Sequence, residues 1–373
     1  MPLLRLASRF GRVHRRYIRH NLQFCIEYRV RGISSPDAEG RIIIMSGTIK
    51  TMRTAASDMR FANPDVTADG APRAQVELRA LSTLRFNTGT LCSIECAHCY
   101  IESSPRNDQL VYLTSSDVRL YLDEVQTLGY PTGEIGFTGG EPFMNPDMIS
   151  MASICLERGH EVLILTNAMQ PMQRPGVKGA LLKLRSAYGD ALKLRVSIDH
   201  FSEALHESER GPGTFIHTLK GLDWLAENDF SFTVAGRTRF GEDEKILREG
   251  YQQLFSARGY KLDAVDPAQL VLFPEMDEQA AVPEITTACW GILDISPDAM
   301  MCASSRMIVK RKGAASTVVL PCTLLAYDPA FEMGSSLTEA ADADGGNFEN
   351  GAVKLNHPHC AKFCVLGGGS CSQ

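Results

Sequence analysis

The chain has 373 residues, of which 44% are hydrophobic and 22% are charged, and its net charge is −6. This composition is typical of a folded globular protein and excludes collagen-like, fibrous and disordered chains. No apolar run reaches the roughly 18 residues that a membrane helix needs, and the net acidity makes nucleic acid an unexpected partner.

The first 26 residues contain six arginines and no acidic residue. Such a segment is typical of an organelle-targeting leader. The stretch that follows, to about Asp69, has little periodicity and several internal methionines, so a start codon placed too far upstream explains the segment equally well. Residues 1–80 are therefore interpreted as an N-terminal extension, and we expect a cytoplasmic protein.

From residue 81, short β-branched runs alternate with longer helical ones. The pattern predicts six strands, at residues 84–87, 134–138, 161–166, 193–198, 230–234 and 269–273. It predicts helices at 114/115–128 with Ser116 or Asp117 as the cap, and at 147–158, 179–188, 214–228 and 243–258. Strand–helix alternation implies parallel pairing with right-handed crossovers. Six such units make a partial barrel or an open sheet, with the site at the carboxyl ends of the strands.

After residue 275 the pattern stops. Residues 276–373 are rich in cysteine and glycine and offer one good helix candidate, at 336–341. A hairpin is predicted across 307–319, with its turn at Lys312 and Gly313. Because this region has little apolar periodicity, metal ligation could supply its cohesion.

All eleven cysteines except Cys25 and Cys155 lie in two groups. In a cytosolic protein, such grouping indicates metal binding or catalysis rather than disulfides. The first group is Cys92, Cys96 and Cys99, and the second is Cys289, Cys302, Cys322, Cys360, Cys364 and Cys371.

The first group has x3 and x2 spacing and directly follows a predicted strand. Three thiolates this close can cap one face of a cubane iron–sulfur cluster and leave one iron open. A structural zinc site would need a fourth Cys or His nearby. His98 lies between the second and third thiols, which is a poor position from which to close a tetrahedron. The spacing therefore favours iron–sulfur over zinc.

This loop resembles the cluster loop of the radical S-adenosylmethionine (radical SAM) superfamily, which has the pattern CxxxCxφC with an aromatic φ. His98 holds the aromatic place, and Tyr100 also follows the common form. The run GGEP at residues 139–142 is similar to the family's motif after its second strand. The resemblance covers about residues 81–275 and implies an α/β fold, a partial (β/α)6 TIM-like barrel.

The resemblance also implies the chemistry. Cys92, Cys96 and Cys99 would hold a [4Fe–4S] cluster whose open iron binds the amino and carboxylate groups of S-adenosyl-L-methionine. One electron, from a reductant such as flavodoxin or ferredoxin, would cleave the sulfonium to methionine and a 5′-deoxyadenosyl radical. That radical would abstract hydrogen from a peptide or small-molecule substrate.

Cofactor contacts are carried over from the family to residues at the strand ends. The glycines of the GGEP run would let backbone groups reach the methionine end of the cofactor, and the glutamate would accept from its ammonium. Arg210 could contact a carboxylate, although a salt bridge explains it equally well. The predicted cofactor-binding residues are Tyr100, Gly139, Gly140, Glu141, Asn167, Ser197, Asp199 and Arg210.

Residues 276–373 resemble the SPASM/Twitch appendage, which carries auxiliary iron–sulfur clusters. Two fully cysteine-ligated clusters would need more thiols than this region offers. Either one complete auxiliary [4Fe–4S] cluster forms with spare thiols, or two clusters recruit His357 or His359; we favour one. The predicted ligands are Cys302, Cys322, Cys360, Cys364 and Cys371.

The sequence thus predicts a radical SAM enzyme for oxidation or cross-linking of its substrate. The auxiliary cluster could relay an electron out of a substrate radical or bind the substrate. No catalytic acid or base is identified, because the chemistry belongs to the cofactor. The alternative is a zinc-binding or cluster-binding interaction or sensor protein without radical chemistry.

Overall fold

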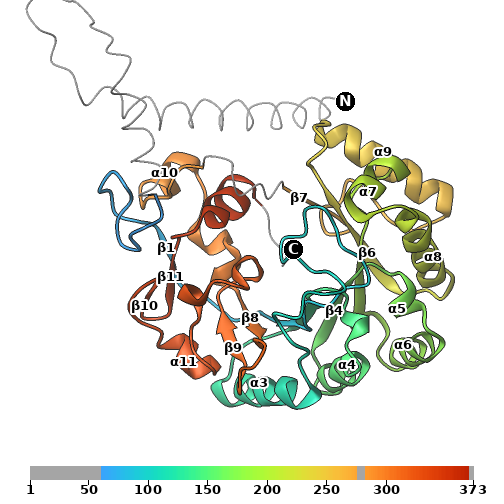
Figure 1. The fold of residues 1–373 in the computed structure, drawn as a ribbon, viewed down its shortest axis with the longest axis horizontal. Helices are drawn as coiled ribbons and strands as arrows, with labels where there is room; N and C mark the ends of the chain where they lie inside the picture. Colours follow the sequence, from blue (N-terminus) through green and yellow to red (C-terminus); the bar gives the residue numbers. More distant parts are fainter. Residues whose placement is uncertain (1–59, 275–281, 369–373) are drawn as a thin grey trace, which may run out of the picture.

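Eight strands form one curved sheet in the computed structural model, which describes residues 60–274 and 282–368 (Figure 1). The strand order is β7-β6-β5-β4-β3-β2-β8-β9, and every neighbouring pair is parallel except the β8–β9 hairpin. The strands are Thr83–Asn87 (β2), Glu134–Thr138 (β3), Glu161–Thr166 (β4), Leu192–Ser197 (β5), Ser231–Arg237 (β6), Leu270–Phe273 (β7), Ser305–Val309 (β8) and Val318–Leu320 (β9). The six predicted strands and the α/β fold class are confirmed.

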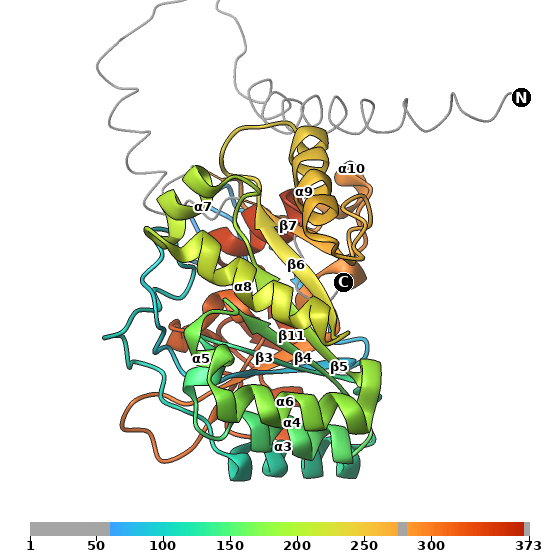
Figure 2. The same cartoon turned by 90° about the vertical axis from the view of Figure 1, so that its right-hand side faces the viewer.

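The helices that follow the strands lie on the outer side of the sheet (Figures 1 and 2). This placement fits the apolar strands of a parallel sheet, which must be covered on their faces. The main helices are Ser115–Leu128 (α3), Met148–Glu157 (α4), Gln170–Gln173 (α5), Pro175–Tyr188 (α6), Glu203–Arg210 (α7), Thr214–Glu227 (α8) and Glu244–Arg258 (α9).

Helix α3 begins with a capping box that corrects the predicted cap. Thr114 is the N-cap, and its hydroxyl accepts a hydrogen bond from Asp117 N, while the Asp117 carboxylate accepts from Thr114 N at 2.8 Å. Ser116 and Asp117 were therefore wrong as caps, because Asp117 occupies the third helical position and reaches back. The helix buries one stripe at 118, 121, 122 and 125 against the sheet.

The predicted hairpin exists, but its first strand joins the main sheet. β8 pairs in parallel with β2 and antiparallel with β9. Because it pairs with β2, strand β8 extends the sheet beyond the six predicted strands. All five of its residues are buried. The domain boundaries at residues 80 and 275 stay predictions, and the sheet continues across the second of them.

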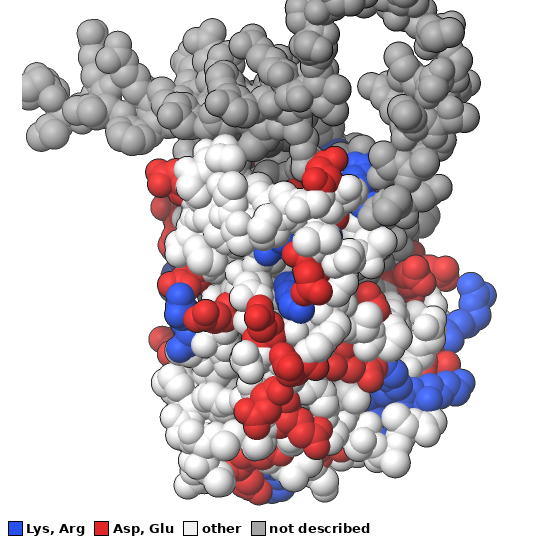
Figure 3. Space-filling model, turned by 90° about the vertical axis from the view of Figure 1, so that its left-hand side faces the viewer, with Lys and Arg blue, Asp and Glu red and all other residues white. Residues whose placement is uncertain are grey.

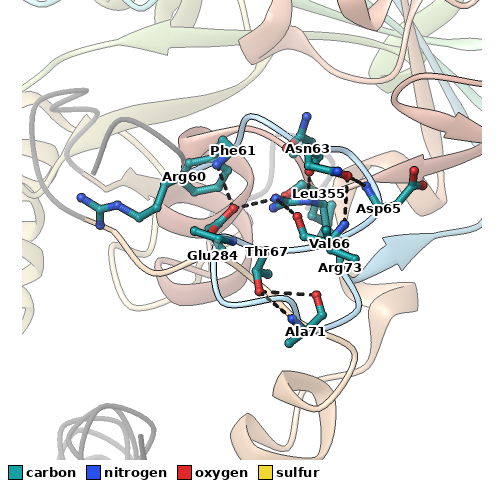
Figure 4. Close-up of polar contacts among 12 residues, drawn as sticks. Arg60, Phe61, Asn63, Asp65, Val66, Thr67, Ala71, Arg73, Glu284 and Leu355 are labelled. Atoms are coloured by element: carbon teal, nitrogen blue, oxygen red, sulfur yellow. Dashed lines mark hydrogen bonds and ion pairs between the residues drawn. The ribbon is translucent and has the colours of Figure 1, made fainter. Parts of the chain in front are cut away.

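A second, three-stranded sheet joins the two ends of the described chain. Its order is Gln75–Val76 (β1), Ala352–Lys354 (β11) and Phe348–Glu349 (β10). Figure 4 shows residues 60–73 wrapped around Glu284, whose carboxylate accepts from Phe61 N, Ala68 N and Arg73 Nη2. Burial acts to raise the pKa of Glu284, but these hydrogen bonds outweigh it and lower the pKa.

More short helices follow residue 281 than the one predicted at 336–341. That helix is present as Leu337–Ala341 (α11), and the others include Cys289–Leu293 (α10) and a π-helix at Cys360–Leu366. They were missed because short helices leave little periodicity in the sequence. Cys25, Cys371 and residues 1–59 lie outside the described residues.

Acidic side chains gather on the face of the molecule that Figure 3 shows. This face includes the elements on the left of Figure 1, among them β10 and α11. Asp342, Asp344 and Glu349, in and around these elements, are exposed. Among the described residues, none of the helices is long and apolar enough to cross a membrane.

Candidate functional site

A pocket lies at the carboxyl ends of the parallel strands, where the topology predicts the site. The first cysteine loop, the ends of β3 to β7 and two segments of the C-terminal region line this pocket. The sequence-predicted residues that the structure brings together here are Cys92, Cys96, Cys99, Tyr100, Gly139, Gly140, Asn167, Ser197, Asp199 and Arg210. Of the predicted cofactor contacts, Glu141 alone does not line the pocket.

The three cysteines present their sulfurs from a loop rather than from a strand or helix. Cys92 is buried, whereas Cys96 and Cys99 are half-buried. Burial raises the pKa of Cys92 to about 12 and of Cys96 to about 11. Both groups are therefore neutral thiols before ligation, so binding iron would release their protons.

Within residues 60–274 and 282–368, no group of three or more His, Cys, Asp or Glu side chains is arranged to hold a single metal ion. A cubane distributes its thiolates over separate irons, so its ligands need not converge on one point. The three thiols line one pocket, and the residues present fit a cluster of this kind.

Glu209, at the end of α7, fastens the cysteine loop from one side. Its buried carboxylate accepts from His98 Nδ1 at 3.0 Å and from Arg239 Nε at 2.9 Å. Its backbone carbonyl accepts from Ala97 N at 2.8 Å, and Arg237 Nη1 donates to the carbonyl of His98. Sequence reasoning missed Glu209, although its position beside Arg210 was a signal, as were Arg237 at the end of β6 and Arg239 just after it.

Tyr327 fastens the same loop from the C-terminal region. Its hydroxyl donates to the carbonyl of Ile101 at 2.7 Å and accepts from Asn107 Nδ2 at 3.0 Å. The loop is also tied to β3, because the hydroxyls of Tyr100 and Thr138 lie 3.2 Å apart. These contacts position the cysteines relative to the strand ends.

Asp199 and Arg210 form a two-pronged ion pair in the pocket wall. Arg210 Nε and Nη2 donate to the two carboxylate oxygens at 2.9 and 3.0 Å. Burial acts to raise the pKa of Asp199, but Arg210 outweighs it and lowers the pKa. The structure therefore contains the salt bridge that we considered for Arg210, and its guanidinium is already paired.

The glycines of the GGEP run are required by packing against the cysteine loop. A side-chain carbon at Gly140 would lie 2.2 Å from the carbonyl oxygen of Leu91, and one at Gly139 would lie 2.5 Å from that of Gly89. Gly139 also has a φ of +134°, which L residues rarely adopt. The predicted role in freeing the cofactor's methionine end stays a prediction; the structure shows close backbone packing.

Glu141 lies inward of the pocket wall, and its predicted contact with the cofactor stays a prediction. It is 1% exposed, and its carboxylate accepts from Asn167 N and Thr166 Oγ1, both at 2.8 Å. Burial raises its pKa. Because Glu141 bonds inward to the end of β4, it holds Asn167 in place, and Asn167 Nδ2 in turn donates to Ser93 Oγ at 3.2 Å.

Four cysteines of the second group line a separate, small cavity. They come from three parts of the chain, and apolar side chains such as Leu325 and Val353 form the rest of its wall together with His359. Burial lowers the pKa of His359 to about 4. The four cysteines are Cys302, Cys322, Cys360 and Cys364.

The remaining cysteines lie elsewhere. Cys289 does not line this cavity, and its sulfur contacts Thr286 N and Oγ1 at 3.4 Å. Cys155 is fully buried in the hydrophobic core of the sheet and helices, as expected for a structural thiol. Four thiols around one cavity match the ligand number of a cubane cluster.

The first pocket and the second cavity lie next to each other, because they share a lining residue. Thr323 and Leu324, which follow Cys322, line the first pocket, and Leu324 also lines the second cavity. Phe363, beside Cys364 in the π-helix, lines the first pocket and stacks on Phe273 at the end of β7, with 5.9 Å between ring centroids. π-Helical turns are rare and frequently occur at functional sites.

The part of the chain that forms this pocket is similar to a known protein family. Residues 86–249 match the model of the Radical SAM superfamily. An AdoMet-dependent heme synthase of Methanosarcina barkeri is 29% identical over 212 residues, which are 51% of this chain and 57% of that protein. The subtilosin biosynthesis protein AlbA of Bacillus subtilis is 27% identical over 177 residues, 47% of this chain and 36% of AlbA.

These alignments span about half or less of the curated relatives' lengths. Among solved structures, Streptococcus suis SuiB bound to its precursor peptide SuiA aligns with a TM-score of 0.49 and 12% identity, covering 88% of this chain and 77% of that chain. The family-model match includes the first cysteine loop and the GGEP run, and the family uses a [4Fe–4S] cluster and S-adenosylmethionine.

Proposed function

We propose that this protein, which carries a radical SAM superfamily domain over residues 86–249, cleaves S-adenosylmethionine reductively and uses the radical to abstract hydrogen from a substrate in the first pocket. When bound there, the cluster would supply the electron and the open iron for this cleavage. A one-electron donor such as flavodoxin or ferredoxin would reduce it. Cys92, Cys96 and Cys99 would hold the cluster.

The observation that carries the proposal is the convergence of the three thiols with the ends of the neighbouring strands on one pocket. The surrounding residues position the loop: Glu209 and Tyr327 brace it from two sides. Asn167, Ser197 and Asp199 supply polar groups along the same wall. A cofactor held between the loop and these strand ends would be contacted on several sides.

Apolar side chains in the same pocket support a substrate with apolar groups. Phe273, Leu324 and Phe363 are among the residues that line it. We propose a peptide substrate that is oxidised or cross-linked, because the relative AlbA acts in the biosynthesis of a bacteriocin. A small-molecule substrate is the second candidate, because the chain is also similar to a heme synthase.

The second cavity would hold an auxiliary [4Fe–4S] cluster. The residues that line it include Cys302, Cys322, Cys360 and Cys364. Four thiolates supply all the ligands of one cubane cluster. This set supports the one-cluster hypothesis without requiring Cys371, which lies outside the described residues. Because Leu324 lines both cavities, an auxiliary cluster in the second cavity would lie close to a substrate in the first pocket.

The full chain, reconstituted anaerobically, tests the proposal. We expect about eight irons per chain, four at each site, and 5′-deoxyadenosine after addition of dithionite and S-adenosylmethionine. Cys92→Ala should abolish the product, and Cys155→Ala, a buried cysteine outside both groups, is the matched control. Zinc in place of iron would contradict the proposal, as would a loaded protein that forms no 5′-deoxyadenosine.

A further inference from the structure

Arg306, in strand β8, is a buried cation with an unusual set of partners. It is 2% exposed. Nη1 donates to the carbonyls of Cys302 and Ser305 at 2.7 and 2.8 Å, and Nη2 donates to that of Gly351 at 3.4 Å. Among the described residues, no carboxylate pairs with it.

Two other arginines with little exposure differ from Arg306. The Arg73 side chain is 1% exposed and contacts Glu284 at 2.6 Å, and the Arg210 side chain is 12% exposed and contacts Asp199 at 2.9 Å. A buried charge is costly unless a counter-charge compensates for it. Backbone carbonyls satisfy the donors of Arg306, but they carry no net charge. Its charge thus lacks the compensation that the other two have.

The position of Arg306 indicates where its counter-charge would come from. One of its partners is the carbonyl of Cys302, whose side chain lines the second cavity. The ionisable groups near its guanidinium include the thiols of Cys302 and Cys322 and the phenol of Tyr130. Neutral thiols give no counter-charge, whereas thiolates bound to iron form an anionic centre.

We propose that Arg306 is the counter-ion of the cluster held in the second cavity and that it sets the reduction potential of that cluster. The proposal rests on the auxiliary cluster proposed above. Reduction adds one negative charge to the centre, so a fixed buried cation stabilises the reduced state. Arg306 is a positioning and tuning residue, because it binds the backbone of Cys302 rather than a reacting atom.

A redox titration of the second cluster alone tests this role. In the full-length Cys96→Ala protein, reconstituted anaerobically, the signal of the second cluster can be followed by electron paramagnetic resonance. Arg306→Gln should lower the ratio of reduced to oxidised cluster roughly tenfold at a fixed potential, equal to about 59 mV for a one-electron couple.

Two variants serve as controls for this titration. Arg306→Lys keeps the charge, so its reduction potential should stay close to that of the parent protein. Arg119→Gln removes an exposed charge and controls for net charge.

The stability of the iron-free protein gives a second measurement. Without the cluster, Arg306→Gln removes an uncompensated charge, so it should leave the urea midpoint unchanged or raise it, whereas in the loaded protein it should lower it. An iron-loaded Arg306→Gln protein with the parent potential would overturn the role of Arg306 alone. Equal shifts in the Lys and Gln variants would also overturn it. A Cys96→Ala protein that binds no iron would overturn both this role and the auxiliary cluster.

Discussion

The two cysteine sites differ in how their charges are balanced. Around the first pocket, Arg210 is paired with Asp199 and Arg239 with Glu209. Arg237 also lies 3.6 Å from Glu209. Beside the second cavity, the hydrogen bonds of Arg306 go to backbone carbonyls, and no carboxylate among the described residues pairs with it. The arginines of the first site thus have carboxylate partners, whereas Arg306 at the second site has none.

The two sites also differ in their walls. Each site has both buried and half-buried thiols. Polar strand ends line the first pocket, whereas side chains such as Leu325 and Val353 give the second cavity a largely apolar wall. A site that exchanges a charged cofactor benefits from polar groups that are already balanced. A site that keeps one resident anion can rely on that anion for its balance. These differences fit the proposed function, in which the first site exchanges its cofactor and the second keeps a resident cluster.

The largest effect should separate the two sites directly. Cys96→Ala should abolish formation of 5′-deoxyadenosine and remove about half of the iron, because the first cluster is lost. Cys364→Ala should remove a similar amount of iron but spare part of the cleavage. Iron analysis and chromatography of the products check both. Equal loss of cleavage in the two variants would show that the sites do not divide the work.

Asp199→Asn should break the charge balance of the first site. Arg210 would remain buried without its partner, which costs about 3–5 kcal/mol. Because the folded state lowers the pKa of Asp199, its contribution is complete above the ordinary aspartate pKa and is lost as the pH falls through the folded value. Urea unfolding over a pH series should therefore show a difference from the parent protein that shrinks on acidification.

The matched control for this variant is Asp123→Asn. Asp123 pairs with Arg158 at the surface, where its side chain is 64% exposed. Such a pair contributes at most about 1 kcal/mol. If the two variants lose the same stability, the buried pair has no special role in the wall of the first pocket.

Glu209→Gln should weaken the support of the first loop without removing a ligand. Mutation of residues that orient metal ligands typically lowers metal affinity or activity by about 10–100-fold. Retention of iron by the first site under chelator challenge, together with the rate of 5′-deoxyadenosine formation, measures the effect. Glu203→Gln, an exposed glutamate on the same helix, should behave like the parent protein. Identical chelator resistance in both variants would contradict the proposed brace.

Tyr327→Phe should have the smallest effect. It removes a hydroxyl that bonds Ile101 and Asn107, and the loss of such a hydrogen bond costs about 1 kcal/mol. The thermal midpoint of the iron-free protein measures this cost. Tyr112→Phe, which removes a hydroxyl without a hydrogen-bond partner among the described residues, is the control. If Tyr112→Phe lowered the thermal midpoint more than Tyr327→Phe does, the Tyr327 hydroxyl would not be linking the C-terminal region to the cysteine loop.

Local patterns in the sequence accounted for most of the elements and for the residues around the first pocket. The cysteine loop and the GGEP run are contiguous, so their spacing could be recognised without a structure. β8 was recognised as part of a hairpin, but its parallel partner β2 lies more than two hundred residues earlier. The motif that contains Glu141 did not show that its carboxylate bonds Thr166 and Asn167, because a motif shows which residues are present and not which way a side chain turns.

The sequence by itself determined where strands, helices and cysteines fall, because periodicity and spacing are properties of neighbouring residues. Only the tertiary structure decided which charges meet. Glu209 and His98 are 111 residues apart, and Tyr327 and Ile101 are 226 apart. Arg306 bonds the carbonyl of Cys302 only four residues away, but the cavity beside it is completed by Cys322, Cys360 and Cys364 from later in the chain. Burial and pairing of these groups depend on long-range packing, and no local pattern encodes it.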